Sequence, residues 1–69
     1  MSGFKERLDA EFAELSERVQ KLSEFLETRA ALTVHSNEQL NLLVIQLHCM
    51  KAYQSVLERR IQILKEDKQ

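Results

Sequence analysis

The chain has 69 residues, with 10 Lys and Arg against 11 Asp and Glu, one Gly, no Pro and one Cys. A chain of this length buries barely enough apolar surface to offset the conformational entropy lost on folding, so we expect one domain, residues 1–69, that is stabilised by self-association. A single cysteine forms no intramolecular disulfide. Two histidines and one cysteine are also too few for a four-ligand zinc site, so we expect no metal and no cofactor.

Charge and apolar patterning argue against two classes of partner. The formal net charge of −1 removes the long-range attraction on which non-specific nucleic-acid binders depend, so we expect no DNA partner. The longest purely apolar run, residues 42–45, is too short to span a membrane, and residues 1–30 carry too many charges for a signal peptide. We therefore expect a cytoplasmic protein with no membrane partner.

Apolar residues near the start of the chain recur at alternating intervals of four and three, which is typical of a heptad stripe on an α-helix. This spacing predicts a first helix over residues 4–29. The residues of the stripe are Leu8, Phe12, Leu15, Val19, Leu22 and Leu26.

Residues 30–36 are expected to form a loop, because they include β-branched residues and lead into a helix start. Ser36 and Gln39 have the spacing of a capping box, in which each side chain bonds to the backbone amide of the other residue. A second helix is predicted from there, over residues 37–65. A short connection between two long helices favours an antiparallel hairpin.

The second helix carries two apolar seams on nearly opposite sides, and a single neighbouring helix covers only one of them. An uncovered seam of this length is larger than soluble monomers tolerate. The predicted fold is therefore all-α, an antiparallel two-helix hairpin that homo-oligomerises into a helical bundle. Gln54, which is polar within the first seam, is typical of a residue that fixes register or oligomer order. The first seam is Leu40, Leu43, Leu47, Met50, Gln54, Leu57, Ile61 and Leu64, and the second is Leu42, Ile45, Cys49, Ala52, Val56 and Ile63, with Arg59 replacing one apolar residue.

The sequence offers little for catalysis. His48 and Cys49 are adjacent, so on a helix they point about 100° apart and do not form a nucleophile and base pair within one chain. Gly3 is the one glycine, so there is no glycine-rich phosphate loop. We expect a protein that is not an enzyme.

Gln46, Tyr53 and Arg60 are spaced seven residues apart and form a line along the second helix. An amide, a phenol and a guanidinium beside an apolar surface can read the edge of a base, stack on it and neutralise a phosphate. The alternative is an internal hydrogen-bond ladder, in which Tyr53 and Arg60 pair with carboxylates such as Glu11 or Glu14. The sequence leaves both interpretations open.

The second helix contains the pattern LLxxQLxxMxxYxxxLxxRI over residues 42–61, preceded by FLxT at residues 25–28. With these motifs the chain resembles a family of small bacteriophage proteins over residues 4–61. That family is similar to the helical-hairpin phage sponges that inhibit cyclic-nucleotide immune signalling, such as the anti-CBASS and anti-Thoeris proteins. The resemblance implies a compact homo-oligomer, often a hexamer, in the cytoplasm of an infected bacterium.

The resemblance also implies a ligand and a site. Such sponges bind a cyclic oligonucleotide or a cyclic ADP-ribose-type signal between protomers without cleaving it. Tyr53 and Arg60 fit the aromatic and basic roles in such a site, Gln46 would read the base edge, and Arg18 and Lys21 would contact phosphates. Two other functions remain open. One is a structural or protein-binding coiled-coil module that inhibits a host protein, and the other is a small RNA-binding hairpin dimer.

Overall fold

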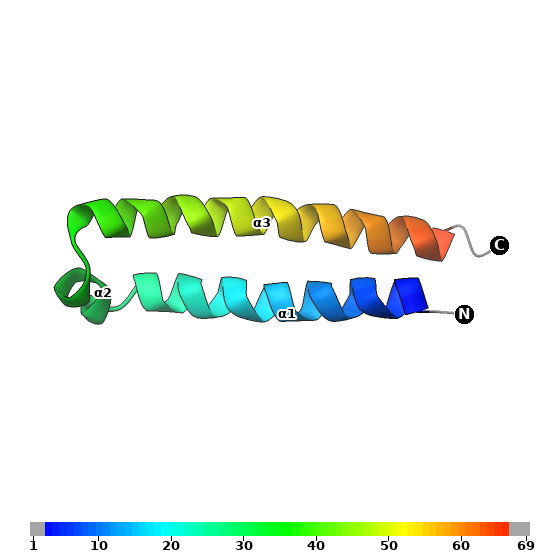
Figure 1. Ribbon diagram of the computed structural model, residues 1–69, viewed down its shortest axis with the longest axis horizontal. Helices are drawn as coiled ribbons and strands as arrows, with labels where there is room; N and C mark the ends of the chain where they lie inside the picture. The colour runs from blue at the N-terminus through cyan, green and yellow to red at the C-terminus, as the bar shows by residue number, and fades with distance from the viewer. Residues whose placement is uncertain (1–2, 67–69) are drawn as a thin grey trace.

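The computed structural model describes residues 3–66, without the side chains of residues 32 and 34, and forms an elongated helical hairpin (Figure 1). It consists of α1 (Gly3–Leu26), α2 (Arg29–Val34) and α3 (Asn37–Glu66). The long helices α1 and α3 lie antiparallel and side by side, and α2 closes one end of the hairpin (Figure 1). Nearly all described residues are helical and none of them forms a strand, so the all-α prediction is confirmed.

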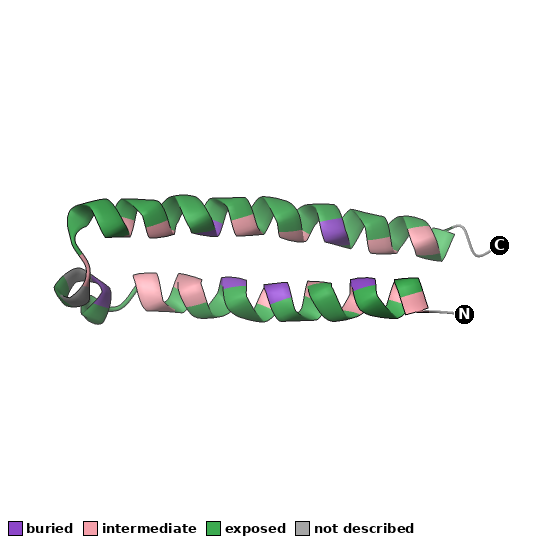
Figure 2. Ribbon diagram, in the orientation of Figure 1, coloured by how far each residue is buried: buried purple, intermediate pink, exposed green. Residues whose placement is uncertain are grey.

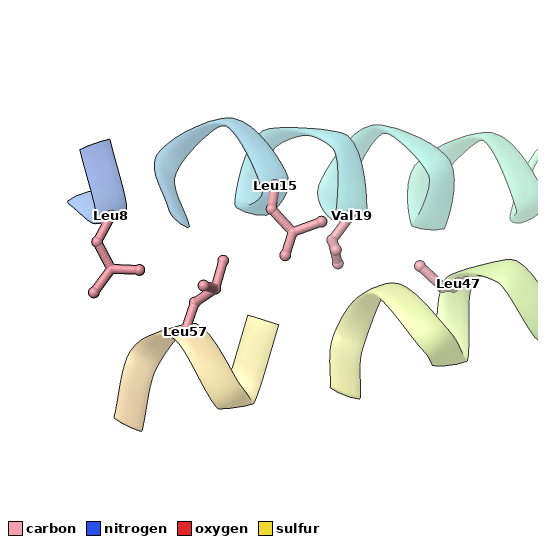
Figure 3. Packing of buried hydrophobic residues seen from close by; sticks show 5 residues of the cluster. All are labelled: Leu8, Leu15, Val19, Leu47 and Leu57. Carbon is pink, nitrogen blue, oxygen red and sulfur yellow. The ribbon is translucent and has the colours of Figure 1, made fainter. Parts of the chain in front are cut away.

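The apolar stripe of α1 is the face that meets α3. Leu8, Leu15 and Val19 are buried between the helices, where they pack against Leu47 and Leu57 of α3 (Figure 3). The remaining stripe residues are partly buried and pack around this cluster. Heptad spacing in the sequence therefore coincides with burial in the structure, because residues three and four positions apart share one face of a helix.

Helix α1 ends at Leu26, three residues before the predicted end. The amides of Glu27 and Thr28 donate to carbonyl oxygens three residues back, at 3.1 and 3.0 Å, which tightens the last turn. The Thr28 hydroxyl also donates to the carbonyl oxygen of Phe25, at 2.6 Å. The Phe25 carbonyl oxygen at the helix end thus accepts two hydrogen bonds from Thr28, one from its amide and one from its hydroxyl.

The predicted loop over residues 30–36 is wrong in its larger part, because α2 occupies Arg29–Val34. Alanine and leucine are strong helix formers, and residues 30–32 supply three of them in a row. Ala31 is only 1% exposed, so packing of α2 against the hairpin adds to this preference. After α2, the ring of His35 packs edge-on against Phe25, with the ring centroids 5.6 Å apart.

Helix α3 starts with the Ser36 half of the predicted capping box. The amide of Gln39 donates to the Ser36 hydroxyl oxygen at 3.2 Å, and the amide of Leu40 donates to the Ser36 carbonyl oxygen at 2.9 Å. Farther along, Gln54 faces α1, and its side-chain amide donates to the Ser16 hydroxyl oxygen at 2.9 Å. This polar pair within an apolar seam holds α1 and α3 at one relative height.

The second apolar seam of α3 faces away from α1 and is exposed (Figure 2). Leu42, Ile45 and Val56 are 53%, 57% and 53% exposed, which is high for large aliphatic side chains on a small protein. We refer to this surface as the outer face of α3, which consists of Leu42, Ile45, Cys49, Ala52, Val56 and Ile63.

Candidate functional site

Tyr53 lies on α3 at the border between the α1 contact and the outer face, and it is 42% exposed. Its hydroxyl donates a hydrogen bond to the carboxylate of Glu11 on α1. This bond is the main cause of a raised pKa of Tyr53, and partial desolvation and the negative charge of Glu11 raise it further. The nearby positive charges of Arg60 and Arg18 act in the opposite direction on the pKa of Tyr53. The phenol therefore contacts one carboxylate and experiences the charges of two guanidinium groups.

Arg60 contacts an aromatic ring of α1 instead of a carboxylate. Its guanidinium carbon is 5.8 Å from the ring centroid of Phe4, within the range of a cation–π interaction. Beside this pair is a shallow hollow of about 170 Å³, lined mainly by apolar side chains of both helices. Sites for drug-sized ligands usually have roughly 300–1,000 Å³, so the hollow of one protomer is too small to enclose a nucleotide.

The other three predicted site residues are Gln46, Lys21 and Arg18. Gln46 is exposed two turns before Tyr53 on α3, and its amide contacts the sulfur of Met50 at 3.9 Å. Lys21 of α1 forms an ion pair with Glu17 at 3.5 Å, so its charge is partly compensated. Arg18 is exposed on α1 and close enough to Tyr53 to act on its pKa. Among the predicted residues, Arg60 and Arg18 thus act electrostatically on the phenol of Tyr53.

The line of Gln46, Tyr53 and Arg60 can be interpreted either as a ligand-binding surface or as an internal hydrogen-bond ladder. The structure agrees with each interpretation in part. The contact between Tyr53 and Glu11 is the one that an internal ladder predicts. Arg60 does not follow that ladder, because it packs over Phe4, a residue that the sequence analysis did not single out. Tyr53 and Arg60 are both exposed residues, so both can still contact a ligand.

The described residues offer no support for a metal centre or a membrane span. No three His, Cys, Asp or Glu side chains within residues 3–66 are placed to hold a metal ion. None of the helices in that part of the chain has both the length and the apolar character needed to cross a bilayer. The candidate site is a surface of aromatic, basic and apolar side chains.

Tyr53 is the one tyrosine of the chain, so its titration can be followed without interference. We expect the folded protein to form phenolate at a higher pH than an unfolded chain, because Glu11 accepts the phenol's proton in a hydrogen bond. The stabilising contribution of this contact is complete below the ordinary tyrosine pKa of about 10 and is lost as pH rises through the raised value. Ultraviolet absorbance of the phenolate during a pH titration measures the pKa of Tyr53. Glu11→Gln should lower the midpoint of this titration, and an unchanged midpoint would contradict the hydrogen bond between Tyr53 and Glu11 as the cause of the raised pKa.

The sequence profile of one protein family, Sequestin, matches residues 2–63. The chain belongs to the Sequestin family. A 7.5 kDa protein encoded in the denB–rIIB intergenic region of Enterobacteria phage T4 is 39% identical over 61 residues, which make up 88% of this chain and 94% of that protein. No solved structure matches the chain. The predicted relation to small phage proteins is confirmed, and the name Sequestin indicates a sequestering function.

Proposed function

We propose that this Sequestin protein is a phage counter-defence sponge. It binds a cyclic oligonucleotide or cyclic ADP-ribose-type immune signal and holds it without cleaving it. The observation that carries the proposal is the position of Tyr53 and Arg60, which are both exposed at the edge of an uncovered apolar face. An aromatic ring and a guanidinium in such a place can stack on a base and neutralise a phosphate.

The ligand site lies between protomers of a homo-oligomer, which the resemblance to phage sponges suggests is a hexamer. The hollow beside Arg60 has about 170 Å³, so enclosing a nucleotide requires walls from a second chain. The outer face of α3 borders Tyr53 and provides the apolar surface through which chains can associate. A symmetric oligomer also presents several equal sites, which suits a protein that acts by removing a signal.

Each candidate residue has a separate role in this site. The ring of Tyr53 stacks on a base, Arg60 and Arg18 neutralise phosphates, Gln46 reads a base edge, and Lys21 adds a weaker phosphate contact. The negative charge of Glu11 repels phosphates. Its carboxylate oxygens can instead accept hydrogen bonds from a ribose hydroxyl or an amino group of the base. The hydrogen bond of Tyr53 to Glu11 fixes the ring before the ligand arrives, which lowers the entropic cost of binding.

Isothermal titration of the purified protein with cyclic dinucleotides, cyclic trinucleotides and cyclic ADP-ribose isomers tests this function. We expect tight binding of one ligand class with fewer than one site per chain. Tyr53→Ala should weaken binding by at least about tenfold through lost stacking, whereas Tyr53→Phe should retain most of the affinity. Arg60→Ala should weaken binding at least about tenfold through loss of a charge-assisted contact.

Arg29→Ala is the matched control for Arg60→Ala, because it removes the same charge from an exposed position on α2. It should leave the affinity unchanged. Chromatography of the ligand after release from the protein should return it intact, whereas a cleaved product would contradict sequestration. If the folded protein binds no nucleotide of the panel, the function is wrong and a protein-binding module becomes the better interpretation.

A further inference from the structure

No described element of residues 3–66 covers the outer face of α3, which is the more exposed of two apolar seams on one helix. The buried core between the helices is small, since Leu57 is its one fully buried large side chain among the described residues. A chain of 69 residues with such a core gains much from covering a further apolar surface. The outer face therefore needs an occupant, and its own pattern indicates which one.

We propose that the outer face packs against the same face of a second copy, with the two α3 helices antiparallel and Cys49 of each copy opposite Ala52 of the other. The inference rests on the self-association included in the proposed function, but it does not depend on the identity of the ligand. It specifies the direction and the register of the contact between two chains.

The spacing of the outer face supports this register. Its residues alternate at intervals of three and four, which is the repeat of a coiled-coil seam. When Cys49 lies opposite Ala52 of the second copy, Ile45 lies opposite Val56 and Leu42 opposite Arg59, so the seams overlap without a gap. Small side chains at the centre allow the helix axes to approach closely, and the larger aliphatic side chains pack on both sides.

Charge complementarity selects the antiparallel direction. Over positions 38–63 of the seam, Glu38 and Arg59 are the charged residues, and they lie near opposite ends of α3. In the antiparallel pair, Arg59 extends over Leu42 of the second copy and reaches Glu38 one layer farther on. In a parallel pair, Arg59 would face Arg59 and Glu38 would face Glu38, which places like charges in contact.

The contacts that Arg59 makes within the protomer do not oppose an ion pair with Glu38 of the second copy. Arg59 is 3.6 Å from the Glu66 carboxylate and 3.4 Å from the Gln62 amide oxygen, and the side chains of Arg59 and Glu66 are 60% and 58% exposed. Exposed ion pairs of this kind contribute little to stability. The stem of Arg59 is also long enough to cover an aliphatic side chain while its guanidinium reaches a carboxylate.

This register also affects the candidate ligand site. Gln46, Tyr53 and Arg60 follow the outer face along one edge, and in an antiparallel pair equivalent edges of the two helices lie next to each other. Tyr53 of one copy then lies beside Gln46 of the other, on both sides of the two-fold axis. The stacking ring and the base-reading amide of one site would come from two chains.

Cysteine cross-linking in a Cys49→Ala background tests the register. Two variants of different mass, one with Ile45→Cys and one with Val56→Cys, are mixed, oxidised and analysed by intact mass. We expect cross-linking between the two variants and little within either one. The two copies of position 45 would lie roughly 16 Å apart along the helix axis in the proposed register, too far for a disulfide.

Light scattering on the same samples separates the possible failures. Cross-links within each variant would show a parallel pair and overturn the inference. An oligomeric mass with no cross-link would show that chains associate through another surface, which also overturns it but leaves the sponge intact. A monomeric mass would contradict self-association itself, whereas loss of nucleotide binding in the titrations would contradict the ligand and leave the register standing.

Discussion

Leu57→Ala is expected to lower the free energy of unfolding by about 2–5 kcal/mol, which is the range for truncating a fully buried leucine. Leu57 is 0% exposed and lies between α1 and α3, next to Leu8 and Leu15 (Figure 3). Removing its side chain leaves a cavity in a core with few other buried residues. Because small domains are often stable by only about 5 kcal/mol, the variant should be largely unfolded at moderate temperature. Urea denaturation followed by circular dichroism measures the change.

Val44→Ala is a suitable control, because Val44 is an aliphatic residue of the same helix but is 41% exposed. We expect a change below about 1 kcal/mol, since the substitution removes little buried surface and alanine favours helix. Both unfolding curves should be recorded at several protein concentrations, because association contributes to stability. Equal destabilisation by the two substitutions would contradict the packing of α3 against α1.

Much of the fold can be predicted from the sequence, because periodicity reports which face of a helix is buried. The stripe that includes Leu8, Leu15 and Val19 predicts the α1 surface that meets α3. The spacing of Ser36 and Gln39 predicts the start of α3, since a side-chain cap has a strict local geometry. These features depend on neighbouring residues along the chain, so no tertiary information is needed to find them.

The contacts of the candidate site were less predictable, because they depend on how the two helices are aligned. In an antiparallel pair, the positions where the first helix ends and the second begins determine which residues face each other. Helix α1 ends at Leu26 instead of residue 29 and α2 occupies most of the predicted loop, so the predicted helix ends do not by themselves give the observed pairing. The pairing of Tyr53 with Glu11 is one of the two that the sequence analysis offered, and the contact of Arg60 with Phe4 lies seven residues farther along both helices in the same alignment.

Gln54 combines a feature that the sequence predicts with a contact that only the structure shows. Its polar side chain interrupts an apolar seam, so the sequence indicated a role in register but gave no partner. The structure supplies Ser16 as that partner, at 2.9 Å. Gln54 lies on the seam that faces α1, so it aligns the two helices within a protomer. It is not part of the outer face of α3, whose central residues carry no polar side chain of this kind.

Ile45→Glu is expected to dissociate the oligomer, with the association constant lowered at least about hundredfold. Ile45 is 57% exposed in the protomer and lies in the outer face of α3, so folding of a single chain tolerates a carboxylate there. Association would bury that carboxylate against apolar side chains of the second copy, which costs several kcal/mol unless the charge is paired. Light scattering over a dilution series measures the change.

Val44→Glu is the matched control for this prediction. It replaces the neighbouring β-branched residue, 41% exposed, by the same side chain, and both variants are one unit more negative than the native net charge of −1. Position 44 lies about 100° around the helix from position 45, outside the outer face, so the oligomer should persist. Dissociation of both variants would indicate a general charge effect, and persistence of both would exclude the outer face as the contact.

The same pair of variants connects assembly to ligand binding. If the nucleotide site is built from two chains, Ile45→Glu should lose nucleotide affinity at concentrations where it is monomeric, even though it retains Tyr53 and Arg60. Val44→Glu should bind as the native protein does. Unchanged affinity in a monomeric Ile45→Glu variant would place the whole site within one protomer, where the hollow of about 170 Å³ would have to be enlarged by movement of α1 against α3.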